Sequence, residues 1–180
     1  YPKEVKFFPG LLPGKAAESN EINKASDLIN NSKKPVILAG HGVLLSGATK
    51  ELIRFAEKGK IPVSPTLLGI GGFPGNHILN MGWMGMHGNA SANNAIQNAD
   101  LLIACGMRFD DRVTGKLETY SPNSKKIHID IDSSELNKNV KADVGIHGDL
   151  KNVIQKLVKK VGNFDRSAWF NQIQKWQSEV

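Results

Sequence analysis

The sequence predicts an α/β protein, with a doubly wound, mostly parallel Rossmann-like sheet of about six strands flanked by helices. Short continuous apolar runs are typical of strands that are buried on both faces. The segments between these runs carry apolar residues at helical spacing. No hairpin signal joins one run to the next, so we expect right-handed crossovers through the helices.

The composition is that of one ordinary globular domain, because 180 residues with 40% hydrophobic and 22% charged side chains are enough to bury a core. The net charge is +6, but the lysines are dispersed without interleaved aromatic residues, so no nucleic-acid partner is expected. No apolar run approaches about 18 residues, which predicts no membrane span. The lone Cys105 lies in an apolar run and fits a reducing, cytoplasmic location.

The first expected elements are a helix and a strand. The helix begins near Ser19, places Ile22, Ala25, Leu28 and Ile29 on one face, and ends before Pro35. Pro35–Ala39 is the first strand, and Gly40-His41-Gly42 follows it. These glycines indicate either a close backbone approach to a ligand or a turn that needs a positive φ, and the pattern is not a full dinucleotide fingerprint. His41 could face a ligand or solvent.

A second helix and strand follow, and then a long glycine-rich stretch. Apolar positions from Ala48 to Ala56 form one helical face, and Ile61–Val63 form a short strand. Thr66–Gly88 contains seven glycines and no clean period, which is typical of a binding loop or lid. Its methionines and Trp83 either cover a core edge or form an apolar wall for a planar ring. His77 and His87 lack partners at metal-ligand spacing, so no metal site is expected.

The centre of the chain carries the strongest signal for a ligand site. A helix over Ser91–Ala99 begins just after Gly88, and its free N–H groups could hold a pyrophosphate. The strand Leu101–Cys105 then ends in a loop with four charged residues, Arg108, Asp110, Asp111 and Arg112. Ligands collect at the carboxyl ends of parallel strands. The alternative is a solvated turn with local ion pairs.

The remaining strands are Lys126–Ile131 and Val144–Ile146. Asp130 stands where an acidic residue commonly accepts hydrogen bonds from ribose. Asp132 is expected to cap a helix that begins at Glu135, and Asp149 could cap the next helix. Apolar stripes predict helices over about 150–161 and 167–180, and the aromatic residues of the second helix, Trp169, Phe170 and Trp176, should pack on other parts of the protein.

Three segments resemble the middle domain of the acetohydroxyacid synthase (acetolactate synthase) family: RFDDRVTG at 108–115, GMHGNASANNAIQNADLLIACG at 85–106 and KKIHIDIDSSELNKN at 125–139. The resemblance extends from about Ala25 to Leu157. It implies a linker and the tail of a preceding domain over 1–18 and a central FAD-binding-type domain over 19–162. Residues 163–180 would be a helix that leads to a third domain.

The resemblance also implies FAD as the cofactor of this domain. Arg108 would neutralise pyrophosphate charge, Asp130 would hold ribose, and Asp111 and Arg112 would lie near the substrate channel. The residues expected to contact the cofactor are Gly40, Gly42, Met86, His87, Gly88, Gly106, Arg108, Arg112, Val113, Asp130, Ile131 and Asp149.

For the whole protein, the resemblance implies condensation of two 2-ketoacids, pyruvate and 2-ketobutyrate, with loss of carbon dioxide, in branched-chain amino-acid biosynthesis. Thiamine diphosphate and Mg²⁺ would be bound by the first and third domains, so this domain would hold no catalytic residue and be inactive alone. A homo-oligomer with a regulatory small subunit is expected. The alternatives are the middle domain of another thiamine-diphosphate enzyme, which binds ADP or no nucleotide, and a purely structural interdomain module.

Overall fold

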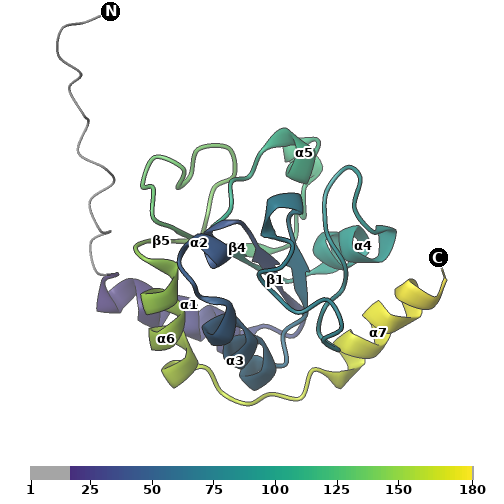
Figure 1. The fold of residues 1–180 in the computed structure, drawn as a ribbon, viewed down its shortest axis with the longest axis horizontal. Helices are drawn as coiled ribbons and strands as arrows, with labels where there is room; N and C mark the ends of the chain where they lie inside the picture. Colours follow the sequence, from purple (N-terminus) through teal and green to yellow (C-terminus); the bar gives the residue numbers. More distant parts are fainter. Residues whose placement is uncertain (1–16, 180) are drawn as a thin grey trace, which may run out of the picture.

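The sheet has five strands, and all of them are parallel (Figure 1). The computed structural model describes residues 17–179. The strands follow the order β2-β1-β3-β4-β5, and their bounds are β1 Pro35–Ala39, β2 Val63–Pro65, β3 Leu101–Cys105, β4 Lys125–Asp130 and β5 Val144–His147. The predicted fold class is confirmed, with five strands where about six were expected. The linker predicted over 1–18 lies almost entirely outside the described residues.

Helices cover both faces of the sheet, as the doubly wound prediction requires (Figure 1). One face is covered by α1 Ser19–Asn31, α3 Thr49–Gly59 and α6 Leu150–Lys160, which pack on one another. The other face is covered by α4 Ala90–Asn98 and α7 Ser167–Ser178. Helical spacing predicted these five elements. It did not predict the four short ones, which are α2 Gly42–Leu45, η1 Leu67–Gly69, α5 Asp111–Thr114 and η2 Leu117–Thr119.

The two helical layers create two cores, because side chains alternate between the faces of each strand. Ile37 and Ile103 are fully buried on the side of α1, α3 and α6. Leu38 and Leu102 are fully buried on the side of α4 and α7. A fully buried aliphatic side chain of this size contributes about 1.5–3 kcal/mol, so the central strands form the most stable part of the domain.

The glycine-rich segment runs beside β2 without forming a strand of its own. It joins β2 through an isolated parallel bridge between Val63 and Asn80 and through a hydrogen bond of 3.0 Å from the N–H of Met84 to the carbonyl of Pro65. Gly71, Gly82 and Gly85 have positive φ angles, which turn the chain repeatedly and prevent a continuous ladder.

The helix expected after Asp132 is wrong. Asp132 accepts a hydrogen bond of 2.9 Å from the backbone N–H of Ser134, so it stabilises a turn there.

The aromatic face of α7 packs against the second core, as its apolar stripe predicted. Trp169 and Ile173 are buried, and the indole Nε1–H of Trp169 donates to the carbonyl of Pro35 over 3.2 Å. Trp176 meets Trp169 edge to face at 5.9 Å. Within residues 17–179, every helix falls short of the length and apolarity that crossing a membrane requires.

Candidate functional site

The strand order creates a crevice between β1 and β3. From β1 the chain continues to β2 on one side, whereas from β3 it continues to β4 on the other side. The two connections therefore diverge at the carboxyl ends of these adjacent strands. In open α/β sheets this topological switch point is the usual place for a ligand.

Glycines let the two strand ends meet at the floor of this crevice. The N–H of Gly42 donates to the carbonyl of Gly106 over 2.9 Å. A Cβ on Gly40 would lie 2.2 Å from the oxygen of Gly106, which no side chain tolerates. Only Gly106 of the three has a positive φ, +58°. Of the two alternatives for Gly40 and Gly42, a turn that needs positive φ is therefore wrong, and close approach to the backbone of Gly106 is what requires glycine there.

Above this floor lies a cavity of about 790 Å³, within the range of about 300–1,000 Å³ that small-molecule sites occupy. Its wall is mostly apolar, with a few charged groups, as is usual for cofactor sites. The wall is formed by His41, Gly42, Leu45, Ser46, Thr66, Leu67, Leu68, Trp83, Met84, Met86, His87, Gly106, Met107, Arg108, Asp110, Arg112, Val113, Asp130, Ile131, Asp149 and Leu150.

Ten of the twelve residues predicted from the sequence to contact a cofactor line this cavity, namely Gly42, Met86, His87, Gly106, Arg108, Arg112, Val113, Asp130, Ile131 and Asp149. Gly40 lies beneath the wall against Gly106. Gly88 packs against the loop, where an added Cβ would lie 2.5 Å from the carbonyl oxygen of Trp83. Asp111, expected near a substrate channel, is exposed outside the wall, and its side chain accepts from the backbone N–H of Arg112.

The residues of the methionine-rich stretch divide between the core and the cavity wall, and a planar ring against that wall stays a prediction. Met81 is buried in the second core and does not reach the cavity. Met86 is 69% exposed and lines the cavity together with half-buried Trp83. His41, whose direction the sequence left open, is exposed and lines the cavity as well.

Sequence reasoning missed the apolar part of the wall, including Leu45, Leu67 and Leu68. These leucines are exposed by 76%, 62% and 65%. An isolated leucine carries no chemical signal in a sequence. However, Leu67 and Leu68 follow β2 almost directly, so their place at the carboxyl edge of a parallel sheet was an available clue.

The cationic groups of the wall come from the loop after β3. Arg108 and Arg112 are exposed, and within residues 17–179 neither forms an ion pair. Within the described chain, the alternative of a solvated turn with local ion pairs therefore fails in its ion pairs, although the side chains are exposed to solvent. The amino end of α4, predicted to bind a pyrophosphate, contributes no described residue to the wall. Its Asn93 side chain instead pairs with the backbone of Gly85 at 3.0 and 2.9 Å.

Asp130 is the most buried carboxylate of the wall, at 9% exposure. Its Oδ1 accepts a hydrogen bond of 2.9 Å from the backbone N–H of Asp132. Burial raises the pKa of Asp130, although this hydrogen bond opposes the shift. Asp149, across the β4–β5 pair, caps α6 by accepting from the N–H of Asn152 over 2.9 Å while it also lines the cavity. Hydrogen-bonded carboxylates at two adjacent strand ends suit the hydroxyl groups of a sugar.

A doubly wound parallel sheet with glycines at the ends of β1 and β3 and a cavity at the switch point defines a Rossmann-like α/β domain. Residues 22–157 match the family model for the central domain of thiamine pyrophosphate enzymes. The chain belongs to that family.

Curated relatives carry more specific names. The chain is 48% identical to a "Probable acetolactate synthase large subunit" of Methanocaldococcus jannaschii over 96% of this chain and 30% of that protein. It is 44% identical to an "Acetolactate synthase" of Mycobacterium leprae over 92% of this chain and 27% of that protein. It is 39% identical to an "Acetolactate synthase large subunit" of Buchnera aphidicola over 98% and 32%, respectively. The chain thus spans about 30% of the length of the relatives it matches.

Proposed function

We propose that this chain is the central, FAD-binding domain of an acetolactate synthase large subunit. The observation that carries the proposal is the cavity at the β1–β3 switch point, where ten residues expected to contact FAD come together from five separate segments. The names and identities of the relatives support the same assignment. The enzyme would condense two 2-ketoacids, such as pyruvate and 2-ketobutyrate, with loss of carbon dioxide.

The chemistry of the wall fits a flavin dinucleotide. Arg108 and Arg112 supply free cationic donors for a pyrophosphate. Asp130 and Asp149 supply acceptors for ribose or ribityl hydroxyls. A Cβ on Gly42 would lie 2.7 Å from the Cα of Gly106, so glycine at both positions lets the two strand ends close into one backbone floor beneath the ligand. Met86, Leu67 and Leu68 offer a soft apolar surface for a planar ring.

Condensation with decarboxylation involves no net oxidation or reduction, so FAD would supply a structural element of the site and not redox chemistry. The carbon–carbon chemistry belongs to thiamine diphosphate and Mg²⁺, which other domains of the enzyme would bind. The expected setting is a cytoplasmic homo-oligomer with a regulatory small subunit. In that setting, the task of this domain is to hold FAD and orient it toward the neighbouring domains.

Calorimetric titration with FAD and, separately, with ADP tests the proposal. We expect saturable FAD binding that Arg108→Ala and Asp130→Ala each weaken by about tenfold or more, because each removes a charge-assisted hydrogen bond. Arg54→Ala and Asp27→Ala are matched controls, since both side chains are exposed on helices away from the cavity. These controls should bind FAD as the unmodified protein does.

Two other results would redirect the assignment. Binding of ADP but not of FAD would identify the middle domain of a different thiamine-diphosphate enzyme. Absence of both ligands from the full-length gene product, together with a missing flavin absorbance band, would identify a purely structural interdomain module. The domain alone should form no acetolactate, and turnover by the pure domain would overturn the assignment of the thiamine site to other domains.

A further inference from the structure

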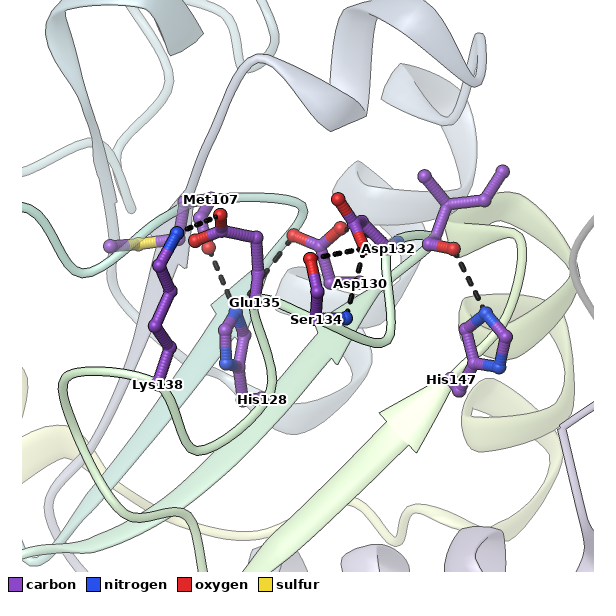
Figure 2. A network of polar contacts seen from close by, with 9 residues as sticks. Met107, His128, Asp130, Asp132, Ser134, Glu135, Lys138 and His147 are labelled. Carbon is purple, nitrogen blue, oxygen red and sulfur yellow. Dashed lines mark hydrogen bonds and ion pairs between the residues drawn. The ribbon is translucent and has the colours of Figure 1, made fainter. Parts of the chain in front are cut away.

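His128 is a buried titratable group that lies directly behind the cavity. It stands on β4, two residues before Asp130, and is 0% exposed. Its Nε2 lies 2.8 Å from the carbonyl oxygen of Met107 (Figure 2). A carbonyl can only accept, so Nε2 carries the proton of the ring. Nδ1 is buried and has no hydrogen-bond partner within residues 17–179.

The same Nε2 reaches toward the carboxylate at the cavity wall. It lies 3.9 Å from Oδ2 of Asp130 (Figure 2). His128 therefore touches two segments that contribute to the wall: the Gly106–Arg108 loop after β3, through Met107, and the end of β4, through Asp130.

An aromatic ring and a carboxylate are the other groups near the imidazole. The ring of Phe109 meets it edge to face at 5.1 Å. Glu135, in the turn after β4, forms an ion pair with Lys138 at 2.7 Å. Burial lowers the pKa of His128, outweighing the opposite effects of the Met107 carbonyl, Asp130 and Glu135. A second proton on Nδ1 would have no acceptor within the described residues, so the ring stays in one tautomer at neutral pH.

We propose that His128 is a positioning residue of the nucleotide site, whose Nε2–H fixes the Arg108 loop relative to Asp130. Arg108 follows Met107 directly, so the hydrogen bond to the Met107 carbonyl fixes the backbone position from which the Arg108 side chain extends. Asp130 ends the same strand, β4, two residues after His128. The hydrogen bond from His128 to Met107 thereby ties the loop that carries the group for the pyrophosphate to the strand that carries the group for the ribose. This inference rests on the proposed function and assigns a further residue to that site.

A matched pair of variants tests the role in the full-length protein. His128→Gln keeps an amide N–H near the place of Nε2, whereas His128→Leu removes the donor at similar volume. We expect His128→Leu to weaken FAD binding by about tenfold and His128→Gln to stay within about threefold of the unmodified protein. Far-UV circular dichroism establishes that both variants are folded. Equal FAD affinity of folded His128→Leu and the unmodified protein would overturn the inference.

A second measurement does not depend on either variant folding. Nitrogen-15 NMR of the histidine rings in the unmodified protein should show His128 protonated at Nε2 and bare at Nδ1, with and without FAD, at neutral pH. A proton on Nδ1 would overturn the inference. If Arg108→Ala weakens FAD binding while His128→Leu does not, only the inference fails. If the unmodified protein binds neither FAD nor ADP, the proposed function fails and the inference with it.

Discussion

At the scale of single residues, Gly40 is a position where the fold leaves no room for any side chain. A Cβ there would lie 2.2 Å from the oxygen of Gly106 and 2.4 Å from the Cβ of Met107. We expect Gly40→Ala to lower the free energy of unfolding by about 2–3 kcal/mol, because two central strand ends must move apart. Urea denaturation measures this. Gly75→Ala is the control, since its Cβ meets nothing within 4 Å and its φ is not positive, and it should change stability by less than about 1 kcal/mol. Equal effects of both substitutions would contradict the packing argument.

Asp130 illustrates a conflict between stability and binding within one side chain. Burial raises its pKa, so the folded state binds the carboxyl proton more tightly than the unfolded state does. The stabilising contribution of the proton is complete below the usual pKa of aspartate and is lost as pH rises through the raised value. At neutral pH the ionised group therefore destabilises the fold.

Asp130→Asn should accordingly raise the thermal midpoint at pH 7 while it weakens FAD binding. The gain should shrink as pH falls below the usual aspartate range, because both proteins then carry a neutral group there. Scanning calorimetry between pH 3 and pH 8 follows the difference. A midpoint that falls at pH 7, or a difference that does not depend on pH, would show that ionisation of Asp130 does not destabilise the fold.

At the scale of elements, prediction succeeded where a pattern repeats and failed where geometry is local. Buried strands such as Leu101–Cys105 are continuous apolar runs, and helices such as α6 have an uninterrupted stripe, so both could be read from the sequence. The turn after Asp132 was mistaken for a helix because an aspartate starts both structures in the same way. The short helices α2 and α5 contain four residues each, which is too few for a period to appear.

Arg166 connects α7 to the ends of two other helices. It is 4% exposed, and its guanidinium donates to the carbonyls of Ile29, Ser32 and Gly59. A cation suits these positions because the carboxyl ends of α1 and α3 carry unpaired carbonyls and negative dipole charge. No repeating pattern in the sequence marks this role, since the carbonyls come from residues more than a hundred positions away.

We expect Arg166→Met to lower the free energy of unfolding by about 2–4 kcal/mol, because the carbonyls of Ser32 and Gly59 lose their donor in a buried place and the carbonyl of Ile29 keeps only Ser32. Hydrogen exchange should accelerate most in α7 and at the ends of α1 and α3. Lys159→Met removes an exposed cation from α6 and should change stability by less than about 0.5 kcal/mol. Faster exchange spread evenly over the sheet would argue against a local anchoring role.

Cys105 reports on the integrity of β3. It is fully buried at the centre of the sheet, and burial raises the pKa of its thiol to about 12. The folded protein should therefore not react with a thiol reagent at pH 8, and labelling in low urea should proceed only at the rate of unfolding. Prompt labelling without denaturant would mean that the carboxyl end of β3, and with it the floor of the cavity, opens locally.

At the scale of the whole molecule, the charged part of the cavity could be predicted more fully than the apolar part. Arg108 and Asp130 are charged residues near the carboxyl ends of buried strands, which is where a parallel sheet collects its ligands. Leu67 and Leu68 also follow a strand, but their place beside the end of β1 depends on the strand order, which cannot be read from local patterns. The same holds for the contact of Gly40 with Gly106, which joins segments that are distant in the sequence.

The last prediction concerns the domain as a cooperative unit. A ligand that binds only the folded state at a hundred times its Kd adds about 2.7 kcal/mol of stability. For a domain of this size, that gain raises the thermal midpoint by about 5–10 °C. FAD should produce this shift in the unmodified protein and in Arg54→Ala, whose side chain lies away from the cavity. The shift should nearly vanish in the double variant Arg108→Ala and Asp130→Ala, because the cations of the β3 loop and the carboxylate of β4 must act on one molecule at once. A full shift in the double variant would place the nucleotide somewhere other than the switch point.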